Sequence, residues 1–235
     1  MRMIVKSAEP ASLAEYRGTV TPERLLSPKA EIFEDYRDKD TLRAFLVTEQ
    51  RGLCCYCLGT IQLDLKSMRI EHWHCQSRYP LERLAYTNLL AACMGNEGKG
   101  IRPSLHHCET RKRNRDLSLN PANPAHDVEG LVRFSGDGSV SSSDPTFDQE
   151  LNTVLNLNHP FLKKQRGGRG WANSKAQSIS GSRSANSCRV ACRLERRVAH
   201  RRPQTLLSGD RVFAAQETEA GPVALGRQAS VGGWL

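Results

Sequence analysis

The spacing of apolar side chains predicts helices in the first fifty residues. Apolar positions recur at intervals of three and four residues, which is the period of one face of a helix. These positions are Ile32, Phe33, Tyr36, Leu42, Phe45 and Leu46. Asp40 is expected to cap the second helix at its start, and Gly52 to end it. We therefore predict an N-terminal helical segment over residues 1–50.

Short β-type runs follow this segment. Residues 60–65 and 68–72 are two such runs, and their closeness in sequence predicts a hairpin, with residues 68–72 as its second strand. Leu81, Leu84 and Leu89 are expected in the core. The stretch "HHCETRKRNRD" is expected to start a short helix. "GLVRFSGDGSVSSS" predicts an exposed hairpin with a Gly-Asp-Gly turn, and residues 145–166 a last helix or loop that packs back.

The composition changes near residue 167. From there on the chain is rich in Arg, Ser, Gly and Ala, and its apolar periodicity is poor. We predict a disordered basic tail over residues 166–235. An alternative interpretation is that a reading-frame change in GC-rich coding sequence produced this tail. Cys188 and Cys192 lack a second cysteine pair, so we assign them no role.

The net charge of +9 and the isoelectric point of about 9.3 favour nucleic-acid binding at first sight. The charge is unevenly distributed, however. From Arg166 onward, eleven arginines and one lysine stand against four acidic residues, which leaves only about +1 for residues 1–165. The overall charge is therefore a property of the tail, and it says little about whether the core binds DNA.

Hydropathy and the chain's start bear on its compartment. The mean hydropathy is −0.53, and no apolar run approaches the roughly 20 residues needed to cross a bilayer. The start "MRMIVKSAEP" has no apolar run typical of a secretory signal. We therefore expect no membrane association and a cytoplasmic location. In that reducing compartment the eight cysteines are expected to be metal ligands or free thiols rather than disulfides.

Four of these cysteines have a spacing that predicts a structural zinc site. Cys54 and Cys57 form a C-x-x-C pair, whose two thiolates can reach one zinc ion from a tight turn. Cys93 and Cys108 are the natural complement, although fourteen residues separate them where two are usual. His107, beside Cys108, is an alternative fourth ligand.

A second group of polar residues suggests catalysis. Glu71 offers a hard oxygen to a divalent cation, and His72 is a candidate general base. Asn88 is expected to hydrogen-bond the backbone and to hold the loop that orients the imidazole. Glu109 is a candidate second carboxylate for the cation, next to the zinc ligand Cys108.

This constellation suits phosphodiester hydrolysis, in which Mg²⁺ stabilises the phosphate while a base deprotonates water. The basic side chains after Glu109 would then hold backbone phosphates; they are Arg111, Lys112 and Arg113. His74, His106 and His126 are further candidates for functional histidines.

The motifs "GLCCYC", "RIEHWHCQS", "YTNLLAAC" and "HHCETRK" resemble those of HNH endonucleases from retron-linked and Septu-type antiphage systems, over about residues 1–165. The resemblance implies an α+β protein with a ββα-metal (His-Me finger) core. It implies a metal-dependent DNA endonuclease that works with an ABC/SMC-like ATPase. It also implies His72 as base, Asn88 as the middle HNH residue, Glu71 and Glu109 at a catalytic Mg²⁺ or Mn²⁺, and zinc on Cys54, Cys57, Cys93 and Cys108.

The chain departs from the family's pattern at three places. Glu109 stands where the last His or Asn is usual, Cys75 stands where proline is common, and a long insert splits the second cysteine pair. The first departure bears on the preference for a metal, and the sequence does not decide between Mg²⁺, Mn²⁺ and Ni²⁺.

We expect a zinc-containing nuclease domain over residues 51–165. The substrate is expected to be DNA, with RNA as the open alternative. A second hypothesis is a non-catalytic zinc module that binds DNA or a protein. A third, a zinc-dependent hydrolase of small molecules, needs an open position on the zinc, whereas a four-cysteine set is closed.

Overall fold

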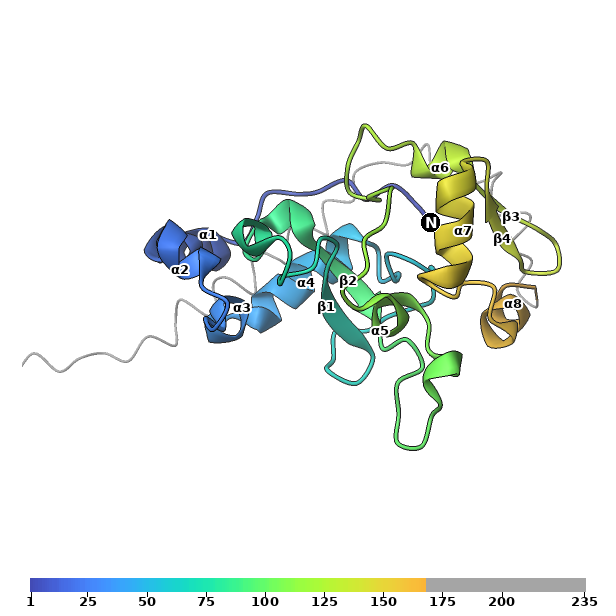
Figure 1. Ribbon diagram of the computed structural model, residues 1–235, viewed down its shortest axis with the longest axis horizontal. Helices are drawn as coiled ribbons and strands as arrows, with labels where there is room; N and C mark the ends of the chain where they lie inside the picture. Colours follow the sequence, from blue (N-terminus) through green and yellow to red (C-terminus); the bar gives the residue numbers. More distant parts are fainter. Residues whose placement is uncertain (168–235) are drawn as a thin grey trace, which may run out of the picture. The chain divides into compact units, whose positions relative to one another are not determined.

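The computed structural model describes residues 1–167 (Figure 1). The predicted tail therefore lies outside the described residues, except for Arg166 and Gly167. The described part is a mixed α+β structure with small two-stranded sheets, as predicted. Its helices are α1 (Ala11–Thr19), α2 (Pro22–Leu26), α3 (Ile32–Asp35), α4 (Lys39–Glu49), α5 (Cys108–Lys112), α6 (Val128–Leu131), α7 (Pro145–Thr153) and α8 (Pro160–Gly167). Its strands are β1 (Met68–His72), β2 (Leu89–Cys93), β3 (Val132–Phe134) and β4 (Val140–Ser142).

Strands β1 and β2 form the antiparallel pair that organises the middle of the chain. Met68 pairs with Cys93 at one end, and His72 pairs with Leu89 at the other. Strand β2, "LLAAC", is apolar throughout and almost entirely buried, because α4 packs against it and α5 contacts it as well. In chain order β1, β2 and α5 therefore make a ββα unit.

The predicted hairpin of residues 60–65 with 68–72 is wrong. Thr60 forms only an isolated bridge with Leu53, and residues 61–67 are a loop. The side chain of Asp64 accepts hydrogen bonds from the backbone N–H groups of Lys66 (2.7 Å) and Ser67 (2.8 Å), which closes a tight turn instead of a strand. Residues 68–72 are thus the first strand of the pair, not the second.

The N-terminal helices and the rest of the described chain share one hydrophobic cluster. Ile32, Phe33 and Leu42 belong to it, together with Leu84 and Leu89. Leu81 is 60% exposed, so its expected place in the core is wrong. The cap of α4 also differs from expectation. The side chain of Asp38 accepts the hydrogen bond from Thr41 N, and Asp40 lies inside the first turn.

The C-terminal elements of the described chain follow the prediction. Strands β3 and β4 form the expected hairpin around Gly136, Asp137 and Gly138, and β4 contacts α7. The hairpin is not exposed as expected, because Val132 and Val140 are buried in the hydrophobic cluster. Helix α7 begins at an Asp144 cap, and α8 ends the described chain. Within residues 1–167, no helix has the length and apolar character required to cross a membrane.

Candidate metal centre and histidine site

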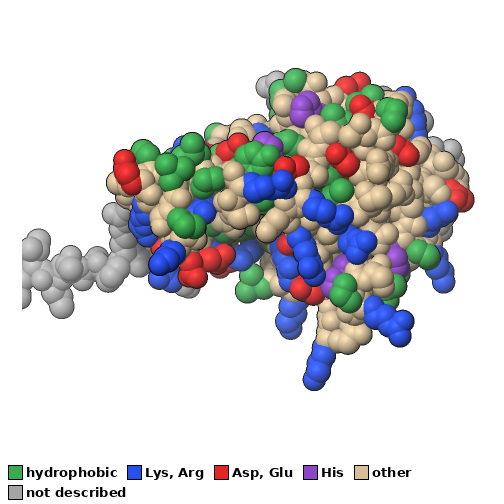
Figure 2. Space-filling view, viewed as in Figure 1, with side chains coloured by type: hydrophobic (Ala, Val, Ile, Leu, Met, Phe, Trp, Pro, Cys, Tyr) green, Lys and Arg blue, Asp and Glu red, His purple; other side chains and the backbone are tan. Residues whose placement is uncertain are grey.

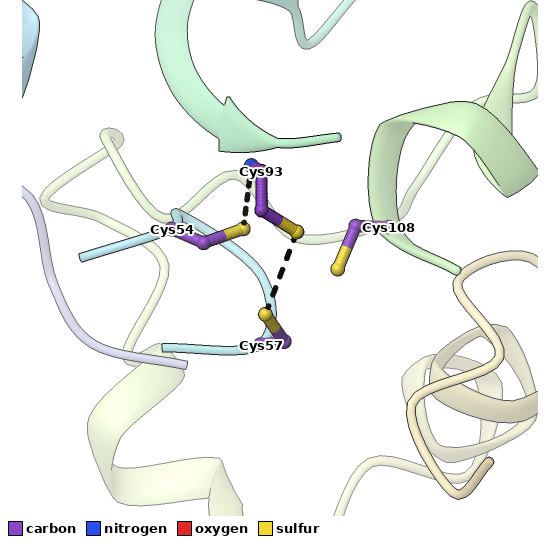
Figure 3. A group of neighbouring side chains, drawn as sticks. All are labelled: Cys54, Cys57, Cys93 and Cys108. Atoms are coloured by element: carbon purple, nitrogen blue, oxygen red, sulfur yellow. Dashed lines mark hydrogen bonds between the residues drawn. The ribbon is translucent and has the colours of Figure 1, made fainter. Parts of the chain in front are cut away.

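Four cysteine sulfur atoms converge where β2 ends and α5 begins. The sulfurs of Cys54, Cys57, Cys93 and Cys108 all lie within 4.8 Å of one another, and Figure 3 shows them pointing toward a common centre. Among residues 1–167, they are the one group of three or more cysteine, histidine or acidic side chains with converging ligand atoms. The sequence prediction of these four ligands is therefore confirmed as a group that could hold a metal ion.

The spacing of the sulfurs fits tetrahedral zinc. The Sγ atoms of Cys57 and Cys93 lie 3.8 Å apart. A tetrahedron with Zn–S distances of about 2.3 Å has edges of about 3.8 Å. A disulfide would need about 2.05 Å between the sulfurs, and all four cysteines are free thiols. The geometry matches a four-coordinate metal and excludes a bridge between these two residues.

The loop that carries Cys54 and Cys57 is closed by its own backbone. Cys54 N donates to Gly59 O at 2.9 Å, directly beside the bridge that joins Leu53 to Thr60. Gly59 N in turn donates to the sulfur of Cys57 at 3.4 Å, and Cys93 N donates to the sulfur of Cys54 at 3.3 Å. Hydrogen bonds of this kind stabilise thiolates, which are the form that binds metal.

A backbone closure explains how Cys93 and Cys108 meet despite their wide spacing. His107 N donates to Gly95 O at 3.0 Å, and Thr110 Oγ1 donates to Met94 O at 3.0 Å, so residues 96–106 form a loop outside the closure. Gly95 has a φ of +57°, and a Cβ there would overlap the carbonyl oxygen of His107. Only glycine meets both demands. The insert is thus accommodated without changing the positions of the ligands.

The thiols of the cluster interact strongly. Burial opposes ionisation of Cys54, but hydrogen bonds with the neighbouring thiols lower the pKa of Cys54 well below its ordinary value. Burial and the hydrogen bonds from its neighbours raise the pKa of Cys108 well above its ordinary value. Protons therefore stay on part of the cluster when no metal is bound, and a divalent ion would displace them.

His107 lies beside the cluster but outside it. Its Nδ1 atom is 3.2 Å from the sulfur of Cys108, and its ring is buried. Burial lowers the pKa of His107 to about 4, so the ring is neutral at pH 7. Because four sulfurs already converge, the alternative of His107 as a fourth ligand is not needed. Its contact with Cys108 is that of a hydrogen-bonding neighbour.

His72 lies at the opposite end of the β1–β2 pair from the cysteines, about 13 Å along the strand at 3.3 Å per residue. It is only 8% exposed, and its ring meets Phe33 edge to face at 4.5 Å between centroids. Its Nε2 atom is 3.0 Å from the carbonyl oxygen of Arg83. Since a carbonyl only accepts, Nε2 carries the proton and Nδ1 presents a lone pair.

Burial also decides the charge of this imidazole. It lowers the pKa of His72 to about 4, and the nearby positive charge of Lys112 acts in the same direction. The ring is therefore a neutral base at pH 7 with a defined tautomer. No feature of the sequence pointed to Arg83, because the partner is a backbone carbonyl and not a side chain.

Asn88 holds the loop after His72, as predicted. Its Oδ1 accepts a hydrogen bond from His74 N at 2.7 Å, and its Nδ2 donates to His74 O at 3.0 Å and to Glu82 O at 3.2 Å. Trp73 N donates to Asn88 O at 3.0 Å and extends the pairing of β1 with the chain before β2. All these bonds are to backbone groups, so Asn88 positions the end of β1 rather than facing a substrate.

Lys112 is buried and is therefore not placed to hold a phosphate at the surface, contrary to expectation. Its side chain is 0% exposed, and its Nζ lies 2.9 Å from Glu71 Oε1 and 3.1 Å from His72 O. Tyr56 donates to the same oxygen of Glu71 at 2.9 Å. Burial raises the pKa of Glu71, and Lys112 opposes that effect. Helix α5 explains this placement, since it starts at the ligand Cys108 and directs Lys112 back over β1.

The predicted catalytic cation site is not assembled in this arrangement. Glu71 pairs with Lys112, and Glu109 pairs with Arg69 at 3.4 Å, so each carboxylate already has a cation. The two carboxylates are near enough for Glu109 to raise the pKa of Glu71. Arg111 is half-buried and Arg113 is exposed, so Arg113 is the more accessible of the two to a phosphate.

His74, a further candidate from the sequence, contacts a carboxylate and two aromatic rings that the sequence did not predict. Its Nδ1 lies 2.8 Å from Glu82 Oε2, and its ring stacks on Tyr79 at 3.9 Å between centroids. The ring of Trp73 also contacts it, at 4.0 Å between centroids. The remaining candidates are elsewhere: His126 accepts a hydrogen bond from Asn120 N at 2.8 Å, and His106 is buried.

Comparison with known proteins does not assign this chain to a family. No protein-family model matches this chain, and no curated protein matches it. The functional assignment below therefore rests on the geometry just described and on the motifs in the sequence.

Proposed function

We propose that residues 1–167 are a zinc-stabilised ββα nuclease domain of the HNH type, which hydrolyses phosphodiester bonds. The observation that carries the proposal is the pairing of His72 Nε2 with Arg83 O at 3.0 Å at the end of β1. This bond leaves a neutral imidazole with its Nδ1 lone pair free to take a proton from water. The zinc on the four cysteines has a structural role and takes no part in this step.

The ββα unit supports the same proposal. Strand β1 presents Glu71 and His72, Asn88 fixes the loop that follows, and α5 brings Glu109 to the same unit. The four-cysteine centre joins the end of β2 to the start of α5. Glu71, His72 and Glu109 thus lie on the ββα unit, and Asn88 directly precedes its second strand.

DNA is the substrate that we propose. Figure 2 shows Lys and Arg side chains over the region of β1, α5 and the loop before α5. The exposed basic residues of these segments include Lys99, Arg102 and Arg113. A few such residues give modest, salt-sensitive affinity for a phosphate backbone. A partner ATPase that delivers the nuclease would compensate for it, and that partner rests on the family resemblance alone.

A divalent cation does not fit between Glu71 and Glu109 as they are now paired. Binding there would require Glu71 to exchange Lys112 for the metal. We assign the cation no step, and its requirement is a variable of the experiment below.

A second candidate function is a non-catalytic zinc module that binds DNA or protein. The burial of His72 and the ion pair between Glu71 and Lys112 favour it, because both are typical of structural residues. In that case His72 contributes to stability only.

Nicking of supercoiled plasmid tests the proposal. The full chain is incubated with Mg²⁺ or Mn²⁺, and zinc is quantified in each preparation. His72→Gln keeps a donor for the carbonyl of Arg83 but loses the basic nitrogen, so we expect it to lose at least about 100-fold in cutting rate and to keep its zinc.

His74→Gln is the matched control, since it makes the same change at the histidine two residues further on, in the loop that follows β1. We expect it to keep zinc and to cut. Full activity of His72→Gln would contradict the assigned base, and absence of cutting by the zinc-loaded wild type would favour the binding module.

A further inference from the structure

Arg166 is a buried cation without an anionic partner among the described residues. It lies near the end of α8 and is 3% exposed. Its Nη2 donates to Leu157 O, whereas Nε and Nη1 have no hydrogen-bond partner within residues 1–167. No carboxylate of the described chain forms an ion pair with it. A guanidinium is always charged, so this charge needs a compensating group.

The nearby groups do not supply that compensation. The ring of Phe134 lies 5.8 Å from the guanidinium carbon, which gives a weak cation–π contact at best. Asp137 is close enough to interact with Arg166 but already pairs with Lys163 at 2.7 Å, and that pair is partly exposed. Removing an ion from water is strongly unfavourable when no partner compensates for the lost hydration.

The four-cysteine centre is the remaining source of negative charge. Arg166 lines the same cavity of about 310 Å³ as Cys57, Cys93 and His107. Burial lowers the pKa of Arg166, and the sulfurs of Cys57 and Cys108 act in the opposite direction. Four thiolates around one Zn²⁺ carry a net charge of −2. Such a centre is itself costly to bury, and the hydrogen bonds that the sulfurs of Cys57 and Cys54 accept from backbone N–H groups offset only part of that charge.

We propose that Arg166 is the counter-cation of the metal-loaded four-cysteine centre, and that metal binding and the docking of α8 stabilise each other through it. This inference rests on the zinc centre of the proposed function and is independent of any cutting activity. Arg166 is a positioning residue here, because it acts on the metal through the thiolates. Linkage makes the effect reciprocal: whatever Arg166 adds to metal affinity, the metal adds to the docking of α8.

Zinc affinity of the full chain is the first measurement, made by competition between the protein and a chromogenic chelator. We expect Arg166→Gln to weaken zinc binding by about 10- to 100-fold, the usual effect of losing a group that supports metal ligands. Arg166→Lys keeps the charge and should retain most of the affinity. Lys163→Gln removes a charge from the same helix but not from the cavity, so its affinity should stay within about twofold of the wild type.

Thermal unfolding with and without zinc separates this role from simple packing. We expect the rise in Tm on adding zinc to be clearly smaller for Arg166→Gln than for the wild type and Lys163→Gln. Equal losses of Tm in the metal-free and zinc-loaded forms would show a packing role and overturn the proposal, as would wild-type zinc affinity in Arg166→Gln. A wild type that binds no zinc would overturn the metal centre itself, a result distinct from both.

Discussion

At the scale of single residues, the backbone decides what the candidate side chains can do. His72 is a neutral base with a fixed tautomer because the carbonyl of Arg83 accepts its Nε2 proton. Lys112 is a structural cation because Glu71 and the carbonyl of His72 surround its ammonium group. Residue type alone made both His72 and Lys112 candidates for a functional role. Only the path of α5 over β1 shows that Lys112 is structural.

The burial of His72 predicts a dependence of stability on pH. Its pKa is about 4 in the folded protein against 6.5 when unfolded, so the unfolded chain binds more protons between these values. Stability therefore falls as pH is lowered through this window. Between pH 7 and pH 5.5 the free energy of unfolding of the wild type should fall by about 1 kcal/mol more than that of His72→Gln. Denaturant unfolding at the two pH values measures it, and identical slopes would contradict the burial of a neutral ring.

The ion pair between Glu71 and Lys112 predicts strong coupling. Lys112→Met leaves a buried carboxylate unpaired, and we expect it to cost about 3–5 kcal/mol of unfolding free energy. The double variant Glu71→Gln with Lys112→Met removes both charges and should recover much of that loss. A loss below about 1 kcal/mol for Lys112→Met, in the same unfolding assay, would mean that Lys112 is free to face solvent or phosphate.

At the scale of elements, the apolar pattern predicted helices and one hairpin correctly, but not the strand that pairs with β1. Helix positions such as Leu42 and Leu46, and the β3–β4 hairpin, follow from local periodicity and a glycine-rich turn. The partner of β1 did not follow from proximity in sequence. The nearest run was β-type, but Asp64 and Ser67 close a turn there. The strand that pairs with β1 is β2, whose continuous apolar run reflects burial on both faces.

Asn88 holds the end of this pairing at which His72 faces Leu89, and its removal predicts a local effect. Asn88→Ala loses three hydrogen bonds to backbone groups of the loop after His72, which at about 1 kcal/mol each should cost about 2–3 kcal/mol. Amide hydrogen exchange of His74 should also accelerate. Asn114→Ala is the control, since Asn114 is exposed. Equal stability of the two variants would show that the loop is held by other contacts.

At the scale of the whole molecule, the metal centre was the most predictable feature, and its surroundings were the least. Cysteine spacing identified four ligands, because a C-x-x-C pair followed by two further cysteines is typical of a structural zinc site. The spacing of Cys93 and Cys108 is wider than usual, and the closure of Gly95 against His107 accounts for it. The burial of Arg166 could not be predicted, since nothing in the sequence distinguishes a buried arginine from an exposed one.

The direct test of the metal centre is the zinc content of the purified chain, measured by elemental analysis in the wild type, Cys54→Ser and Cys75→Ser. Cys54 belongs to the four-cysteine centre, whereas Cys75 is a buried free cysteine outside it. We predict about one zinc per chain in the wild type and in Cys75→Ser, and a large loss in Cys54→Ser. Absence of zinc from the wild type, or equal zinc in Cys54→Ser, would contradict the centre on which the rest of the account depends.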